Sequence, residues 1–401
     1  MISSLSKHKV FLFLFWLLYF IPLAIFHLVP KMEYLSLIIR LPIVLVAFCD
    51  DARNIIKNHL KKSSYLLFIC ILIIWELICV LLNTPSVIIR FLAEAYQIVE
   101  VILILFYSFK HYGIKGMMPL YYVCYLYIFL TFATMLFFPK GMFVSNASSS
   151  IERAEWLFGS KNNVSVFLST FSFVIILMRT KHSILSNLFS WFTVLVSCFC
   201  IVSTGSDSVA FLQGSSTGIL MCCLILFTTF FSNKKLFCSN KHKLLSTNKV
   251  IVFVVVVNVF LLGGLSLPFV NDFIVNVLHK SIDFSGRVYV WKAAIKYIIQ
   301  SPIIGHGYTR VVFYGDTLTS TYNMFLGMMK SFGIPSVVLI LTSIHSLKVT
   351  ASRNIQIVMI GLLTCFINGL MSQVDLNFIV FFMTLVYLLY NNETKKYRTG
   401  C

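Results

Sequence analysis

Three arginines lie in the two longest segments between apolar blocks, residues 138–163 and 271–322. They are Arg153, Arg287 and Arg310. A guanidinium group is planar and can donate two parallel hydrogen bonds to a phosphate, whereas lysine offers only a point charge. Arg287 follows Ser285 and Gly286 where a helical pattern begins, and the N–H groups and dipole of a helix start also favour an anion. The helix start at Arg287 therefore favours an anion, with an ordinary interfacial helix and a solvated Arg287 as the alternative.

The residues that follow this anion site have the pattern of an amphipathic helix. Its apolar residues recur at helical spacing, at Val288, Trp291, Ile295, Ile298 and Ile299. Lys292 and Lys296 lie off that stripe, one turn apart. Asp283 or Ser285 can cap the start of the helix, and Pro302 ends it.

The composition places this helix at a membrane. Of the 401 residues, 59% are hydrophobic and only 11% are charged, whereas soluble domains carry about 25% charged residues. The apolar residues form blocks near the ~20 residues that a helix needs to cross a bilayer, which excludes a soluble enzyme and an outer-membrane barrel. The formal charge of +18 comes from short loops rather than a basic face with interleaved aromatic residues, so a nucleic-acid partner is not expected.

The apolar blocks predict an all-α, polytopic integral membrane protein with about twelve transmembrane helices. Residues 1–401 form a single membrane domain, and the expected spans are 10–29, 34–49, 64–82, 87–109, 117–137, 164–179, 184–203, 209–231, 250–270, 323–347, 354–372 and 374–390. Most of the 32 Lys and Arg residues fall in alternate loops together with both termini, which predicts that this side is cytoplasmic. The segments 138–163 and 271–322 are then periplasmic loops, and the second holds the interfacial helix, with Tyr289 and Trp291 at headgroup level.

Charged residues inside the expected spans form a second cluster. Arg40 lies roughly 9 Å into its span from the outer side, at 1.5 Å per residue, and Arg90 lies at a similar or shorter depth. Glu94 follows Arg90 by one helical turn, and Glu76 occupies the outer half of the neighbouring span. Because ionisable groups in a membrane are costly, they are usually paired or line a wet cavity. We expect ion pairs Arg90–Glu94 and Arg40–Glu76, or a headgroup pocket below the loops.

Four short motifs follow one another over roughly residues 150–345. They are Arg153…Gly159-Ser160-Lys161-Asn162-Asn163, then Ser203-Thr204-Gly205-Ser206-Asp207-Ser208, then Ser285-Gly286-Arg287…Trp291…Pro302-Ile303-Ile304-Gly305-His306-Gly307-Tyr308, then Thr321-Tyr322-Asn323…Gly327…Gly333-Ile334-Pro335. In this order they resemble the motifs of the O-antigen polymerase and ligase family. Two positions depart from that pattern, because Tyr322 stands at the family's His and Asp207 at its usual Arg. Since ligases of the family depend on the His, the departure favours a polymerase.

The resemblance implies that undecaprenyl-pyrophosphate-linked oligosaccharide repeat units are polymerised into O-antigen or capsular polysaccharide. The site would lie at the periplasmic face of the bacterial inner membrane. The alternatives are a ligase that transfers the polymer to lipid A–core and, in another class, a flippase. The resemblance allows a chain-length regulator protein as a further partner, beside membrane lipid, and no cofactor is expected. Binding of substrate and pyrophosphate is assigned to Arg153, Arg287, Arg310, Ser285, Gly286, Asn323, Arg40 and Arg90.

A proton acceptor is needed for the attacking sugar hydroxyl, and a tyrosine in place of the family's His is a poor base. His306 shares the loop of Arg287 and lies between two glycines, so it is one candidate. Asp283 is the other, two residues before Ser285. The loops contain no Asp-x-Asp pair and no metal-ligand spacing of histidines, so we expect no metal, with arginine neutralising the leaving group.

Overall fold

Each apolar block of the sequence contains a helix, as expected for segments whose backbone must satisfy its own hydrogen bonds in lipid. The computed structural model describes residues 2–22, 24–25, 32–54, 63–148, 151–179, 184–204, 216–232, 244–263, 287–309, 311–313, 316–318, 321–372 and 374–399. Within these residues, the helices are α1 (Ile2–Tyr19), α3 (Met32–Asn54), α4 (Ser64–Asn83), α5 (Ile88–Tyr112), α6 (Met118–Phe137), α7 (Lys161–Met178), α8 (Ile184–Ser203), α9 (Ser216–Phe231), α11 (Thr247–Gly263), α13 (Arg287–Gln300), α14 (Met324–Phe332), α15 (Ile334–His345), α16 (Arg353–Met371) and α17 (Leu376–Thr399), with short 3₁₀ turns η2 (Pro85–Val87) and η3 (Gly113–Met117).

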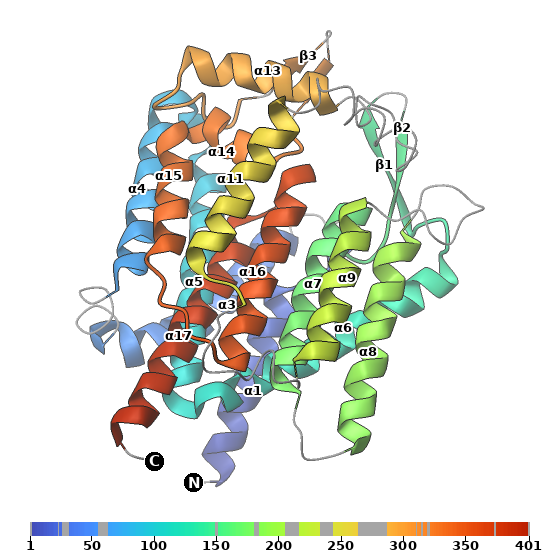
Figure 1. The fold of residues 1–401 in the computed structure, drawn as a ribbon, viewed down its shortest axis with the longest axis vertical. Coiled ribbons are helices and arrows are strands. Elements are labelled where there is room, and N and C mark those ends of the chain that lie inside the picture. Colours follow the sequence, from blue (N-terminus) through green and yellow to red (C-terminus); the bar gives the residue numbers. More distant parts are fainter. Residues whose placement is uncertain are drawn as a thin grey trace.

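The helices stand side by side as a bundle, and α13 lies across one end of it (Figure 1). The start of α1 and the end of α17 lie at the opposite end. Four of the described helices, in the ranges 64–83, 161–178, 185–203 and 353–370, are long and apolar enough to cross a membrane by themselves. Shorter apolar helices accompany them. The chain is thus an integral membrane protein by composition, and the number of twelve spans remains a prediction.

The outer surface of the bundle is apolar where lipid would cover it. Large apolar side chains are exposed along α3, α4, α8 and α11, among them Ile38, Ile74, Leu82, Leu188 and Val259. Soluble monomers rarely expose such continuous apolar surface. The interior instead holds small polar contacts between helices: Ser165 of α7 donates to Asn368 of α16 at 3.3 Å, and Ser172 of α7 donates to Ser197 of α8 at 2.8 Å.

The expected span 323–347 is divided into two helices, which corrects the prediction of one continuous span. The division falls at Gly333, whose N–H still donates to Met329 O at 2.8 Å, while the next N–H, of Ile334, donates to Pro302 O at 2.8 Å. Pro335 lies in the first turn of α15, where the missing N–H of a proline costs no helical hydrogen bond. The short helix α14 is therefore held by the loop after α13.

Two short β-hairpins interrupt the helical fold, and the sequence did not predict them. Strands β1 (Phe143–Ser148) and β2 (Ile151–Glu155) pair antiparallel in the expected loop 138–163. Strands β3 (Val311–Phe313) and β4 (Asp316–Leu318) pair in the expected loop 271–322. The β1–β2 hairpin stands beyond the helix ends in the same half of the molecule as α13 (Figure 1). The two long loops therefore lie toward the same end of the bundle.

Candidate functional site

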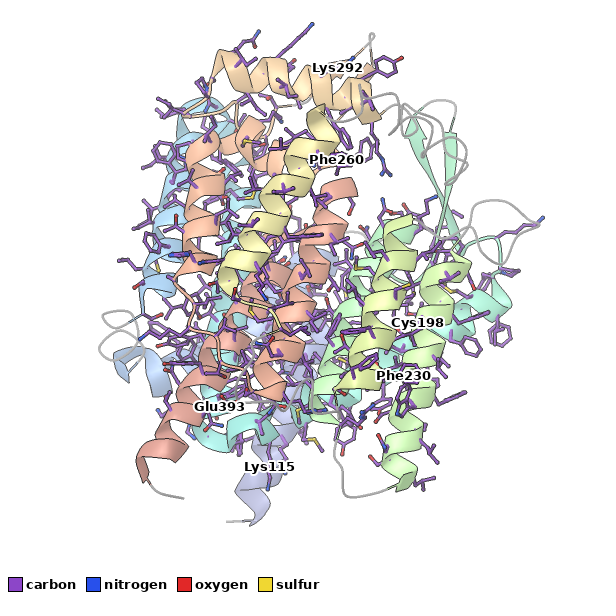
Figure 2. All side chains as sticks on the ribbon, viewed as in Figure 1. Lys115, Cys198, Phe230, Phe260, Lys292 and Glu393 are labelled. Carbon is purple, nitrogen blue, oxygen red and sulfur yellow. The ribbon has the colours of Figure 1, made fainter. Side chains whose placement is uncertain are left out.

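Helix α13 begins at Arg287 and ends before Pro302, as its pattern predicted. Its inner face buries Val290, Trp291, Ala294 and Ile298, whereas Lys292 is exposed at the end of the molecule (Figure 2). Trp291 is only 2% exposed, and its indole N–H donates to Thr321 O at 3.0 Å. Trp291 therefore does not lie at headgroup level as expected. It is buried and connects α13 to the segment that starts α14.

The loop after α13 is fastened to the last turn of α14. The N–H of His306 donates to Lys330 O at 2.8 Å, and the N–H of Gly307 donates to Ser331 O at 2.8 Å. Gly305 has φ +71, and a Cβ at this position would lie 2.5 Å from the backbone carbonyl of Ser331. Only glycine accommodates both the left-handed backbone and this close approach. The Gly-His-Gly motif, residues 305–307, thus fixes the loop after α13 to the last turn of α14.

The His306 side chain contacts Tyr297 of α13. Its Nε2 lies 2.8 Å from Tyr297 O, and its ring stands edge-on to the Tyr297 ring. Because a carbonyl oxygen only accepts, Nε2 donates the hydrogen in this contact. His306 is not among the residues that line the cavity described next.

A cavity of about 660 Å³ lies below the loop, between α5, α14 and the chain that leads into α17. This volume is within the range of small-molecule sites. Its walls carry ionisable side chains of both signs, at Glu76, Arg90, Glu94, Tyr308, Lys330 and Asp375. Of the residues expected in the headgroup pocket, Glu76, Arg90 and Glu94 line this cavity and Arg40 does not; Arg287 of the predicted anion site is not among the lining residues either.

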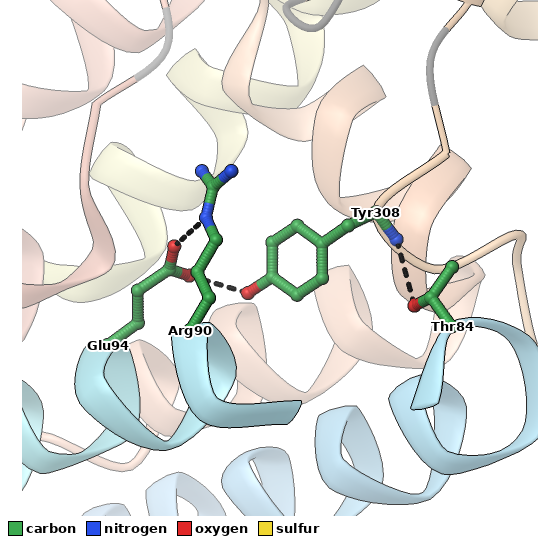
Figure 3. A network of polar contacts seen from close by, with 4 residues as sticks. All are labelled: Thr84, Arg90, Glu94 and Tyr308. Carbon is green, nitrogen blue, oxygen red and sulfur yellow. Dashed lines mark hydrogen bonds and ion pairs between the residues drawn. The ribbon is translucent and has the colours of Figure 1, made fainter. Parts of the chain in front are cut away.

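A network of four residues organises one wall of the cavity (Figure 3). Arg90 Nε contacts Glu94 Oε1 at 3.0 Å, so the expected Arg90–Glu94 pair is confirmed. The Tyr308 hydroxyl donates to Glu94 Oε2 at 2.5 Å, and the Arg90 guanidinium lies over the Tyr308 ring, 5.2 Å from its centroid. The Tyr308 N–H donates to Thr84 Oγ1 at 3.3 Å. Both carboxylate oxygens of Glu94 are therefore occupied.

Tyr308 stays a neutral hydrogen-bond donor in this network. Burial, and next the Glu94 carboxylate, raise the pKa of Tyr308 well above its usual value. The phenol therefore keeps its proton throughout the physiological pH range and donates a hydrogen bond to Glu94. Lys330 is also buried, and its Nζ donates to Thr309 O, which fixes the chain directly after Tyr308.

Arg287 lies over the Tyr322 ring, with 5.6 Å between the guanidinium carbon and the ring centroid. Tyr322 has φ +53, and among the described residues it is the one residue other than glycine with a positive φ. A bulky residue in this region is strained, and such strain is found preferentially at functional sites. Thr321, which lines the cavity, directly precedes Tyr322. The predicted anion-binding arginine is therefore stacked next to the cavity segment.

Residues 192–341 match the family model described as O-antigen ligase. This match supports the resemblance to the O-antigen polymerase and ligase family. No curated protein and no solved structure matches the chain. The family segment contributes α13, the Gly-His-Gly loop and α14, and with them Tyr308 and Lys330 of the cavity. Glu76, Arg90 and Glu94 come from helices outside the match.

Asn323 follows Tyr322 in the family's His-Asn motif, and its side chain is completely buried. Its Oδ1 accepts from Leu326 N and caps α14, while its Nδ2 donates to Asn258 Oδ1 and to Leu370 O, both at 3.1 Å. In this structure Asn323 therefore ties α14 to α11 and α16, rather than facing the cavity as a substrate ligand would. Its role in binding remains a prediction.

Arg40 has a different partner from the expected one. Its Nη2 lies 3.1 Å from Glu100 Oε1 of α5, and both side chains are almost fully buried. Its guanidinium also donates to Leu18 O and lies over the Tyr19 ring. The predicted pair Arg40–Glu76 is therefore wrong, and Arg40 is enclosed by protein groups away from the cavity lining.

Replacing Arg40 by methionine should destabilise the protein by about 3–5 kcal/mol, because Glu100 would be left buried without its counter-charge. Adding Glu100→Gln should restore part of this stability. Thermal unfolding of the purified protein in detergent measures both effects. If Arg40 binds substrate instead, the double variant would regain stability and still lack activity per folded molecule.

Several predicted site residues lie outside the described residues. These are Asp283, Ser285, Gly286 and Arg310, together with the side chain of Arg153, whose backbone pairs with Ser145 in the β1–β2 hairpin. In the part of the chain that the structure describes, no group of three or more His, Cys, Asp or Glu side chains could hold a metal ion. A metal-independent reaction remains a prediction.

Proposed function

We propose that this protein polymerises lipid-linked oligosaccharides. It would transfer a growing saccharide from undecaprenyl pyrophosphate to a sugar hydroxyl of a carrier-linked repeat unit. The observation that carries this proposal is the cavity, because the family segment and α4, α5 and α17 build it jointly at the end of an apolar bundle. A lipid carrier could remain beside the bundle while its sugars enter a polar chamber.

The arrangement of charges suits the two tasks of such a reaction, which are binding the pyrophosphate leaving group and binding the sugars. Arg287, together with Arg153 and Arg310, would hold the pyrophosphate as negative charge develops on the leaving group. The carboxylates and Tyr308 of the cavity would bind sugar hydroxyls, which are hydrogen-bond donors and acceptors. Arg90 would bind either the pyrophosphate or the sugars, since it lines the cavity and its side chain is mostly exposed.

Two observations bear on the choice between polymerase and ligase. Tyr322 stands where the family's ligases have a histidine, and its ring is stacked under the Arg287 guanidinium. This favours a polymerase. The matching family model is described as O-antigen ligase, so transfer of finished polymer to lipid A–core is the second candidate. A flippase is not favoured, because the match supports polymerase or ligase activity in general.

We propose the bacterial inner membrane as the location, with both termini cytoplasmic and the cavity facing the periplasm. The bias of Lys and Arg between loops supports this orientation, and so does the position of α13 opposite to both chain ends (Figure 1). A chain-length regulator protein is the partner that such a polymerase would take. Alkaline phosphatase fused near residue 300 should be active and near residue 240 inactive. The reverse pattern would contradict the orientation.

Deletion of the gene, followed by gel display of surface polysaccharide, tests the function. Loss of a polymerase leaves lipid A–core that carries a single repeat unit, and we expect this result. Core without any repeat, together with carrier-linked polymer accumulating in the outer leaflet, would identify a ligase instead. Core without repeats and without such polymer would indicate a flippase.

A further inference from the structure

Glu76 is a buried carboxyl group without a protein partner. It lies on α4, roughly 10 Å from the outer end of that helix at 1.5 Å per residue, and is only 7% exposed. It lines the cavity, and among the described contacts it makes no hydrogen bond and no ion pair. Burying a carboxylate without a partner is costly. Its side chain is therefore held where a ligand, rather than the protein, would complete its hydrogen bonds.

Two contacts hold the segment around Glu76 against the end of α14. The indole N–H of Trp75 donates to Phe332 O at 2.8 Å, and the Cys79 thiol points to the same oxygen at 3.7 Å. Phe332 is the last residue of α14, which the Gly-His-Gly loop clamps from the other side. Glu76 thus lies on a helix that is hydrogen-bonded directly to the end of α14.

The other carboxylates of the neighbouring helix α5 are occupied. Glu94 is held by Arg90 and Tyr308, and Glu100 by Arg40. The charged and titratable groups that share the cavity with Glu76 are Arg90 and Glu94 on α5, Tyr308 in the loop, Lys330 on α14, Asp375 before α17 and Tyr34 on α3. Lys330 already donates to Thr309 O, and Tyr308 to Glu94. Glu76 is thus the carboxyl group of the described α4–α5 pair that is available to a bound hydroxyl.

We propose that Glu76 accepts the proton of the attacking hydroxyl of the acceptor sugar, which makes it the general base of the polymerisation. This inference rests on the proposed function. In the step, the hydroxyl oxygen forms a bond to the anomeric carbon of the donor saccharide, and the bond from that carbon to the pyrophosphate oxygen breaks. The electron pair leaves with undecaprenyl pyrophosphate, and the proton passes to the Glu76 carboxylate and then to water.

In this role Glu76 replaces His306, because Glu76 lines the cavity; Asp283 lies outside the described residues. His306 is directed at Tyr297 O and does not line the cavity. A carboxylate close to a bound hydroxyl is a common proton acceptor, and positioned general bases contribute about 10²–10⁴-fold to rate. A general base must reach the bound sugar. Glu76 lines the cavity, whereas His306 does not.

The test uses Glu76→Gln in the full-length protein, reconstituted in vesicles with carrier-linked repeat units extracted from the deletion strain. The amide still accepts a hydrogen bond but cannot take a proton at neutral pH. We expect polymer formation to fall by about 10²-fold or more, with unchanged abundance and thermal stability. Glu393→Gln is the matched control, because Glu393 contacts Thr350 at the opposite end of the molecule (Figure 2).

Glu76→Asp and a pH profile separate a base from a structural role. The Asp variant keeps a carboxylate and should retain more activity than the Gln variant. The wild-type rate should fall at acid pH as the base is protonated, and the residual rate of Glu76→Gln should lose this dependence. Full activity of Glu76→Gln, or loss of activity with His306→Ala alone, would overturn the assignment while polymerisation by the wild type stands. A wild-type protein that makes no polymer would instead refute the proposed function.

Discussion

Replacing Arg287 by lysine should remove most polymer while the protein remains at normal abundance in the membrane. The guanidinium lies over the Tyr322 ring and presents a planar fork, which an ammonium group cannot reproduce. Loss of one preorganised donor to a developing oxyanion typically lowers a rate by about 10²–10³-fold. Quantifying the ladder of chain lengths in the complemented deletion strain measures the effect.

Lys292→Arg is the control for this substitution. Lys292 is exposed on the same helix, so exchanging one cation for another there should leave the ladder unchanged. If Arg287→Lys also supports a normal ladder, then net positive charge at the end of α13 is sufficient. The bidentate account of the leaving-group site would then be incorrect.

The second large effect is expected for Gly305→Ala. A methyl group would lie 2.5 Å from the Ser331 carbonyl, and the backbone has φ +71. The left-handed backbone and the overpacking together should cost roughly 2–5 kcal/mol. Since the Gly-His-Gly loop positions Tyr308 for its hydrogen bond to Glu94, polymer formation should be lost as well.

Gly113→Ala is the matched control, because Gly113 also has a positive φ (+56) but nothing lies within 4 Å of an added Cβ. It should cost about 1–3 kcal/mol through backbone strain alone, because its φ of +56 and ψ of −144 lie in a region that essentially only glycine adopts, and it should keep activity. Thermal unfolding in detergent and the polymer ladder compare the two variants. Equal effects would show that backbone strain alone matters, and that the close contact of Gly305 with α14 does not position the site.

The sequence predicts the features that depend on local patterns. Apolar blocks near the length of a membrane span become helices because the backbone has no other partner in lipid. Pro302 ends α13, and the spacing of four residues between Arg90 and Glu94 produces their contact. Each of these follows from residues close together in the chain.

Contacts between distant residues could not be predicted in this way. Glu100 lies sixty positions after Arg40, and only helix packing decides that it, rather than Glu76, is the partner. The stripe of α13 indicates that Trp291 lies on the apolar face, but not that protein instead of lipid covers it. Tyr308 was part of a recognised motif, yet its hydroxyl reaches Glu94 from 214 residues away. The sequence gives one sign that Lys330 lies in a site, which is that a lysine occurs inside an apolar helix.

The break between α14 and α15 had a visible signal, Gly333 followed by Pro335. The surrounding apolar residues outweighed it, because the overall block has the length of one span. The free carboxyl of Glu76 was not foreseeable at all, since a sequence does not show which charged residues remain without a partner. That property follows only from the arrangement of α4 against α5 and α14.

Reconstitution tests the central claim most directly. The purified protein in vesicles receives undecaprenyl-pyrophosphate-linked repeat units as its only sugar substrate, and the products are resolved by gel and mass. We predict carrier-linked chains of two or more units that require no lipid A–core. Repeat units that stay single, while preformed polymer is transferred to added lipid A–core, would contradict the polymerase account.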